Sequence, residues 1–222
     1  MDLYEAIHSR RDVRRFRNEP IPDDVLERIL SAAHHAPSVG FSQPWRFLLI
    51  RSEETRREVH RLFDEANRQA REAYSGERQE LYDSLKLEGI LEAPLNLCVL
   101  SDHRSSSPVL GAQSMPETIA LSTCLAIQNL WLAARAEGVG VGWVSILDPA
   151  SLRRLLALPD GVELVAYLCV GYPESFLEWP LLETVGWRHR LPLRDVIFEE
   201  RFGSQPADVS SDEDAPPPRS QG

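Results

Sequence analysis

The stretch Arg10-Arg11-Asp12-Val13-Arg14 places three guanidinium groups and one carboxylate within five residues, directly after a short amphipathic segment at 3–7. The planar donors of arginine match phosphate oxygens, so three of them at a helix end can hold a phosphate. Asp12 would repel such a ligand, and it must therefore pair with one of the arginines or serve another purpose. Taken alone, a charged run of this kind is also typical of a solvated helix end.

The length and composition fit one globular domain. A chain of 222 residues with 43% hydrophobic residues can bury a sizeable core. The formal net charge of -10 disfavours nucleic acid as a partner.

The cysteines predict a reducing compartment. Cys98, Cys124 and Cys169 each lie in an apolar run, and no two of them have the spacing of metal ligands, so we expect buried free thiols. No cationic and then apolar signal segment opens the chain. Polar residues interrupt the longest apolar stretch, 119–134, which therefore predicts a core helix rather than a membrane span. We expect a cytoplasmic protein that does not associate with membranes.

Apolar periodicity and the positions of proline and glycine predict the secondary structure. We expect Asp23 or Asp24 to cap the second helix. The helix that begins at Pro116 is apolar nearly all round, which is typical of a core helix or a subunit interface. The predicted helices are 2–9, 24–35, 116–137 and 149–157, and the predicted strands are 47–50, 94–100, 143–147 and 162–171, with a last strand or arm at 196–201.

Two segments stand apart from this core. Residues 53–92 are highly charged and predict helices with a break near Ser75-Gly76, which form either a half-buried lid or a plain pair of surface helices. Residues 203–222 are rich in Ser, Pro and Asp and have no apolar period, so they predict a disordered tail. The expected organisation is therefore one domain at 1–202 followed by the tail.

The glycine run at 138–142 follows a predicted helix and opens a strand. A dinucleotide fingerprint has the opposite order, because it follows a strand and opens a helix, so this run does not predict a Rossmann site. The six histidines show no paired spacing, and we expect no metal site.

The remaining polar groups suit a flat, mostly apolar ligand with one phosphate. Arg188 and Arg190 form a second arginine site near the other end of the chain, and Ser38 and Gln43 lie in an irregular loop at 36–45. The arginines would hold the phosphate, and the loop would bond the polar edge of a ring system. Flavin mononucleotide (FMN) fits this description.

The same residues carry a family resemblance. The chain resembles the nitroreductase-like FMN family in its Arg-Arg-x-x-Arg opening, its Ala-Pro-Ser-x-x-x-x-Gln-Pro-Trp loop and its late Arg-x-Arg. It is more similar to the flavin-fragmenting branch, the 5,6-dimethylbenzimidazole synthases, in Asp12 and in the sequences of segments 84–90 and 128–145. It departs from that branch at Ala112 and at 119–121, where such proteins usually carry an Arg and an Asp-Leu-Tyr run.

The resemblance implies a nitroreductase-like α+β fold, with a mixed or antiparallel central sheet flanked by helices and the excursion as a lid. It implies that reduced FMN is the substrate and dioxygen the co-substrate, and that the products are 5,6-dimethylbenzimidazole, the lower ligand of cobalamin, and erythrose 4-phosphate. A homodimer with the flavin at its interface and a separate flavin reductase that supplies reduced FMN are the implied partners. Asp12 and Ser145 are the implied catalytic residues, and the implied FMN-binding residues are Arg10, Arg11, Arg14, Ser38, Gln43, Arg188 and Arg190.

Two other functions stay open at this point. An NAD(P)H-dependent nitroreductase or flavin reductase would keep its FMN, and Asp12 is the residue that argues against it. A non-catalytic flavin-binding protein, with the acidic tail as its docking element, draws its support from the departures near 112–121.

The tail generates the first prediction. Because residues 203–222 carry no apolar pattern, a chain that ends at Phe202 should melt within about two degrees of the full chain. Differential scanning calorimetry of the two chains measures this difference. A drop of many degrees would mean that the tail packs on the domain.

Overall fold

The computed structural model describes residues 1–105 and 107–205, which form two units that are described separately, Met1–Glu178 and the unit that begins at Trp179. In the first unit the helices are α1 (Leu3–Ser9), α2 (Asp23–His34), α3 (Glu53–Arg71), α4 (Glu77–Ser84), α5 (Thr118–Ala136) and α6 (Pro149–Leu155), with a 3-10 turn at Val39–Phe41. Its strands are β1 (Trp45–Ile50), β2 (Leu95–Asp102), β3 (Gly140–Trp143) and β4 (Val162–Gly171). The second unit holds α7 (Leu181–Thr184) and a 3-10 turn at Leu193–Val196.

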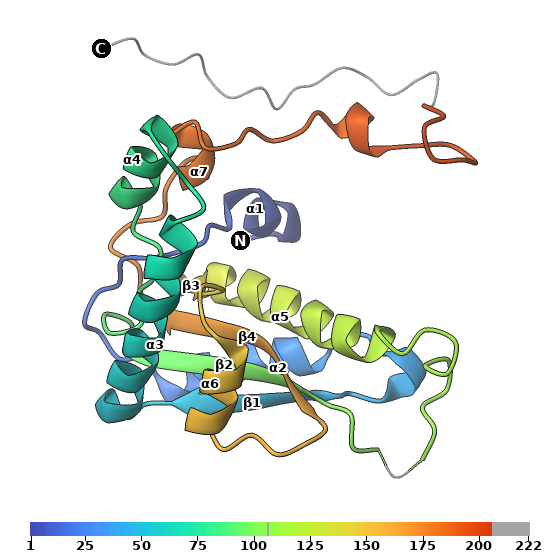
Figure 1. The fold of residues 1–222 in the computed structure, drawn as a ribbon. Helices are drawn as coiled ribbons and strands as arrows, with labels where there is room; N and C mark the ends of the chain where they lie inside the picture. The colour runs from blue at the N-terminus through green and yellow to red at the C-terminus, as the bar shows by residue number, and fades with distance from the viewer. Residues whose placement is uncertain (106, 206–222) are drawn as a thin grey trace. The chain divides into compact units, whose positions relative to one another are not determined.

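The four strands form one sheet in the order β1-β2-β4-β3, and every pair of neighbours is antiparallel. Helices cover both faces, with α5 and α2 on one and α3 and α6 on the other (Figure 1). Residues of β2 alternate between the two cores, because Leu97 and Val99 face α5 while Cys98 and Leu100 face α3. The predicted α+β architecture is confirmed, and its sheet is antiparallel.

Helix α5 is the centre of the first core. Ala126, Ile127 and Leu130 are buried against the sheet, whereas Leu121 and Leu125 on another flank are 53% and 47% exposed. By length and composition alone this helix could cross a membrane, but in the fold it lies along the sheet and packs against α2 (Figure 1). Its nearly uniform apolar character thus leaves one apolar flank on the surface of the chain.

The charged excursion divides at the predicted break. Gly76, which has a φ of +56°, separates α3 from α4. Val59 and Phe63 of α3 are buried against the sheet, so α3 is a core helix despite its charge. Helix α4 is tied back to α3 by the hydroxyl of Tyr82, which donates to Asn67 at 2.6 Å.

The third strand begins and ends earlier than predicted. It spans Gly140–Trp143 rather than 143–147, because the glycine run itself joins the sheet and pairs with the end of β4. Gly138, with a φ of +74°, ends α5 just before it. Gly140 and Gly142 lack side chains on the side where residues 12–14 pass, so that segment lies directly against β3.

Several other predictions were wrong in detail. Pro22 occupies the N-cap of α2, and the carboxylate of Asp24 pairs with Arg28 instead of capping the helix. Cys124 is half-buried because it lies on the flank of α5, although all three cysteines are free. Residues 196–201 have no strand partner among the described residues and form no strand. The predicted tail lies mostly outside the described residues, since 206–222 are not described.

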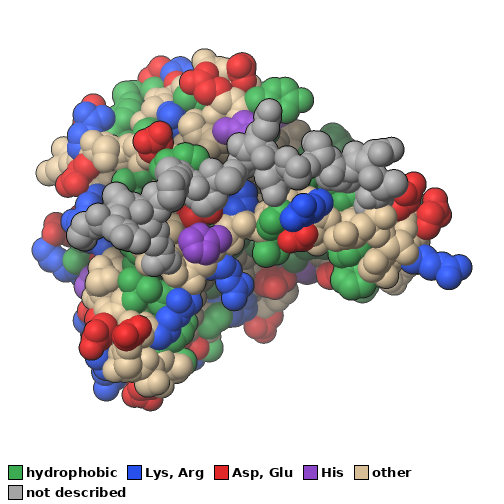
Figure 2. Space-filling model, turned by 90° about the horizontal axis from the view of Figure 1, so that it is seen from above, with side chains coloured by type: hydrophobic (Ala, Val, Ile, Leu, Met, Phe, Trp, Pro, Cys, Tyr) green, Lys and Arg blue, Asp and Glu red, His purple; other side chains and the backbone are tan. Residues whose placement is uncertain are grey.

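The surface carries both charges in small groups. On the face drawn in Figure 2, basic and acidic side chains are interspersed, with hydrophobic side chains exposed between them. Many of the pairs come from single helices, such as Arg57 with Glu53 in α3. Such exposed pairs contribute little to stability.

The contact between β3 and the arginine stretch generates the second prediction. In Gly142→Ala the new methyl group would overlap the carbonyl oxygen of Val13, which belongs to the backbone and cannot move aside. We expect a loss of about 2–3 kcal/mol, or roughly 5–10 °C in Tm. Thermal unfolding of the variant measures it.

Gly140→Ala is the matched control for this substitution. Its methyl group would lie 2.8 Å from a side-chain methyl of Val13 and 3.1 Å from the Cβ of that residue, so it meets side-chain atoms rather than a backbone oxygen and should cost less. Equal losses in the two variants would contradict a backbone contact at Gly142.

Candidate active site

The stretch 10–14 is held along β3 by backbone and side-chain bonds. The amide of Val13 donates to the carbonyl of Val141 at 3.0 Å, and Asp12 forms a parallel bridge with the same residue. The carboxylate of Asp12 accepts the amide of Trp143 at 2.8 Å. The glycines of β3 make this approach possible, so the strand holds the candidate catalytic carboxylate beside its edge.

Arg14 is largely enclosed by the protein. Only 16% of its side chain is exposed, and its guanidinium pairs with the Asp12 carboxylate and donates to the carbonyl of Trp143 at 2.7 Å. Its second terminal nitrogen, Nη1, is buried and has no hydrogen-bond partner within 1–105 and 107–205. A buried donor of this kind is costly unless it is used, and an anionic ligand would satisfy it.

Arg10 and Arg11 have different surroundings. The guanidinium of Arg10 lies over the ring of Trp131, with its carbon 4.8 Å from the ring centroid. The guanidinium of Arg11 donates to the carbonyls of His8 and Arg10 at 2.7 Å each, and to that of Glu178. Arg11 thus binds carbonyls at the C-terminus of α1, a position that suits a cation.

Desolvation has a larger effect on the pKa of Asp12 than the neighbouring arginines have. Although 43% of its side chain is exposed, the surrounding protein removes part of the water from the carboxylate, and this desolvation raises its pKa above the ordinary 3.8. The Arg14 charge, the Trp143 amide and the Arg10 charge lower the pKa, but by less in sum than desolvation raises it. The carboxylate is therefore a better proton acceptor than a free aspartate.

The loop at 36–45, which contains Ser38 and Gln43, has a strained backbone at Phe41 and Gln43. The hydroxyl of Ser38 accepts the amide of Gln43 at 3.1 Å and closes the loop. Gly40, Phe41 and Gln43 have φ values of +53°, +52° and +46°, which place two residues other than glycine in the left-handed region. Strain of this type persists only where the surroundings enforce it, and it is common at ligand sites.

The loop and the arginine stretch lie at opposite edges of the sheet. The loop leads into β1, the stretch lies beside β3, and three interstrand spacings, or about 14 Å, separate these strands. The two sets are also offset along the sheet, because Trp45 is level with Ser101 of β2 while Gly140 pairs with Gly171 of β4. Ser38 and Gln43 therefore do not meet Asp12 within one chain.

The other predicted residues divide between the two units. Ser145 is exposed and lies two residues beyond Trp143, past the end of β3. Arg188 and Arg190 are exposed in the second unit, where the amide of Arg190 donates to Glu183 at 3.1 Å. Ala112, one of the departures, is buried, whereas 119–121 form the first turn of α5.

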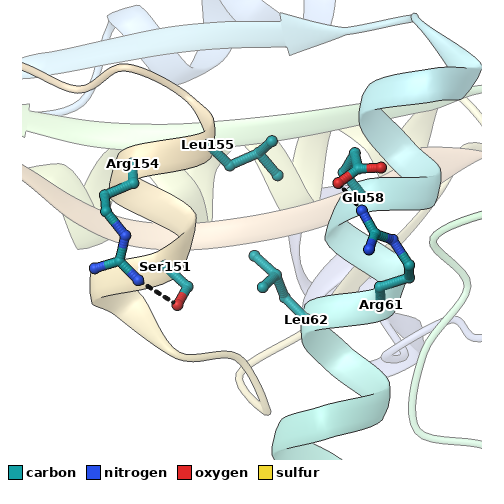
Figure 3. A pocket seen from close by; sticks show the side chains of 6 residues that line it. All are labelled: Glu58, Arg61, Leu62, Ser151, Arg154 and Leu155. Atoms are coloured by element: carbon teal, nitrogen blue, oxygen red, sulfur yellow. Dashed lines mark hydrogen bonds and ion pairs between the residues drawn. The ribbon is translucent and has the colours of Figure 1, made fainter.

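A pocket of about 350 Å³ lies between α3 and α6 and contains none of these residues. Leu62 and Leu155 point into it from the two helices, and Arg61 and Arg154 lie at its rim (Figure 3). Arg61 pairs with Glu58, and Arg154 donates to Ser151 at 2.8 Å. Among the described residues, no group of three His, Cys, Asp or Glu side chains could hold a metal ion.

Two aromatic residues of the site were missed by sequence reasoning. The backbone of Trp143 bonds both Asp12 and Arg14, and Trp131 lies under Arg10. The alternation of glycine with valine at 138–142 was the available signal, because a strand face without side chains allows another backbone to approach. Trp131 gave no signal of its own, since it lies in an apolar helix.

Comparisons with known proteins agree on one family. Residues 7–172 match the nitroreductase family. The 5,6-dimethylbenzimidazole synthase of Rhodobacter capsulatus is 46% identical over 192 residues, 86% of this chain and 92% of that protein. The synthase of Rhodospirillum rubrum is 47% identical over 184 residues, 82% of this chain and 87% of that protein. A crystal structure of oxidized iodotyrosine deiodinase bound to FMN and 3-iodo-L-tyrosine has a TM-score of 0.70 at 28% identity, covering 89% of this chain and 100% of that one.

The third prediction concerns the pKa of Asp12. We expect a value above 3.8 in the intact protein and a still higher value in Arg14→Gln, because the variant loses the charge that opposes desolvation. Carbon-13 NMR titration of the aspartate carboxyls measures both values. Arg11→Gln should change the pKa less, since Arg11 bonds carbonyls. A value below 3.8 in the intact protein would contradict the dominance of desolvation.

Proposed function

We propose that this chain, which belongs to the nitroreductase family and within it to the 5,6-dimethylbenzimidazole synthases, fragments reduced FMN with dioxygen to 5,6-dimethylbenzimidazole and erythrose 4-phosphate. The observation that carries this proposal is the 43–47% identity to three proteins named 5,6-dimethylbenzimidazole synthase, over most of the chain. The carboxylate of Asp12 within the arginine stretch supports it. When bound, reduced FMN supplies the electrons that reduce dioxygen and is itself the substrate.

The phosphate of FMN is assigned to the arginines. Arg14 offers a buried donor that has no partner among the described residues, and Arg10 presents a guanidinium beside an aromatic ring. Because Arg11 bonds three backbone carbonyls, its contribution is mainly to fix the end of α1. Arg188 and Arg190 complete the clamp in this proposal, as the late Arg-x-Arg of the family implies.

Asp12 accepts a proton from the flavin, at the ribityl chain or at the ring edge. Its raised pKa supports this role, and the Trp143 amide fixes one of its oxygens. Ser145 places a hydroxyl near the ring where dioxygen adds. The ion pair with Arg14 supports a different role, in which Asp12 only shapes the phosphate clamp.

A homodimer would bring the two halves of this site together. Within one chain Ser38 and Gln43 lie at the β1 edge, far from Asp12 at the β3 edge. A second copy can place its loop against the arginine stretch of the first, so that one flavin contacts both. The large hydrophobic residues exposed on α1 and α5 supply the surface that such a dimer buries, namely Leu3, Tyr4, Ile7, Leu121 and Leu125.

The second unit offers a further surface for the same partner. Residues 191–202 carry large hydrophobic side chains that are exposed, namely Leu191, Leu193, Val196, Phe198 and Phe202. An arm of this composition is stable in water only when another surface covers it. We assign it to the second copy of the chain.

The remaining proposals concern the surroundings of the enzyme. Helix α4, which packs on the sheet less than α3 does, is the part of the excursion that could cover the flavin as a lid. Three free thiols suit a reducing compartment, so we place the enzyme in the cytoplasm, where a separate flavin reductase supplies reduced FMN.

A second candidate function is an NAD(P)H-dependent nitroreductase or flavin reductase that keeps its FMN. The Asp12–Arg14 ion pair favours it, because a carboxylate used only to shape the clamp needs no proton chemistry. The identity to named synthases supports it less well.

The fourth prediction separates these functions. In air, the intact protein with chemically reduced FMN should form 5,6-dimethylbenzimidazole, detected by chromatography. Asp12→Asn keeps the shape and loses the base, so single-turnover formation should fall by about 10²–10⁴-fold. Binding of oxidised FMN, measured by fluorescence titration, should change little or tighten, because a negative charge near the phosphate is gone.

Two outcomes would contradict this assignment. Normal turnover with weakened FMN binding in Asp12→Asn would mean that the carboxylate only shapes the clamp. No product from the intact protein, together with oxidation of NAD(P)H, would favour the nitroreductase function.

A further inference from the structure

Trp131, on the fourth turn of α5, contacts two residues of the arginine stretch in different ways. Its indole N–H donates to the carbonyl of Arg11 at 3.3 Å. Its ring lies under the guanidinium of Arg10, 4.8 Å from centroid to carbon, within the range of a cation–π interaction. The side chain thus holds the backbone at one residue and the charged group of the residue before it.

The same helix binds the chain directly before the stretch. One turn after Trp131, the guanidinium of Arg135 donates to the carbonyl of Ser9 at 3.2 Å and lies 4.1 Å from the ring of Phe176. Trp131 also approaches the ring of Trp143, with centroids 6.4 Å apart. Helix α5 and strand β3 therefore hold the stretch from two sides, and the ring of Trp131 on α5 lies near that of Trp143 on β3.

We propose that Trp131 is a positioning residue that orders Arg10 and the backbone of Arg11 before the phosphate of the flavin binds. This inference rests on the proposed function, because it assigns the phosphate to the arginine stretch. A free arginine side chain samples many rotamers, and a group ordered in advance loses less freedom when its ligand arrives. Tryptophan suits this role, since it has the strongest ring face for a cation and an N–H that can bind a carbonyl.

The test compares two ligands that differ only in the phosphate, FMN and riboflavin. Trp131→Leu removes the ring face and the N–H, and it should weaken FMN binding by about tenfold while riboflavin affinity changes less than about twofold. Trp131→Phe keeps a ring face and should restore most of the FMN affinity.

A double-mutant cycle shows whether Trp131 acts through Arg10. If it does, Trp131→Leu combined with Arg10→Ala should weaken FMN binding no more than about twofold beyond Arg10→Ala alone. Tyr172→Leu is the matched control, because it removes a half-buried aromatic ring that lies 5.4 Å from Arg17, an arginine outside the clamp. It should leave the preference for FMN over riboflavin unchanged.

Three outcomes would overturn the inference. Equal losses of FMN and riboflavin affinity in Trp131→Leu, with a lower Tm, would show a general structural role. Additive effects in the cycle would show that Trp131 acts independently of Arg10. An intact protein that binds riboflavin as tightly as FMN would remove the phosphate assignment itself, so it is distinguishable from a failure of Trp131 alone.

Discussion

The close approach of residues 12–14 to β3 is the constraint on which the rest of the site depends. Gly140 and Gly142 leave no side chain in the space where Val13 passes. Because of this, the carboxylate of Asp12 reaches the amide of Trp143, and the guanidinium of Arg14 reaches the carbonyl of the same residue. The short strand β3 thereby fixes the positions of both Asp12, the candidate base, and Arg14.

The packing of residues 12–14 against β3 explains how a carboxylate can be tolerated among arginines. Desolvation by the packed backbone raises the pKa of Asp12, while Arg14 and Arg10 act against it. The result is an aspartate that is held by a hydrogen bond and an ion pair, yet remains partly exposed to a ligand. The same geometry leaves one nitrogen of Arg14 without a partner among the described residues, which makes the pair incomplete without an anion.

The sheet places the two sequence motifs of the proposed site at opposite edges. The family motifs at 10–14 and 36–45 lie at the β3 and β1 edges, and the homodimer that we propose would bring both to one flavin. The apolar flank of α5 has the same origin, because a helix that is apolar nearly all round cannot bury every side against one sheet. The dimer interface that we propose would account for both features.

The sequence by itself determined the elements and the chemistry of the motifs. Local periodicity placed β4 at Val162–Gly171 and the break between α3 and α4, and the arginine, loop and Asp12 motifs indicated the family. Tertiary structure alone decided the bonds of Asp12 and Arg14 to Trp143, the ring of Trp131 under Arg10, and the opposite positions of the two motifs. Asp12 and Trp143 are 131 residues apart, and no local pattern encodes which strand edge a loop will meet. The shorter β3 has the same cause, since its glycines joined the sheet only because another segment packed beside them.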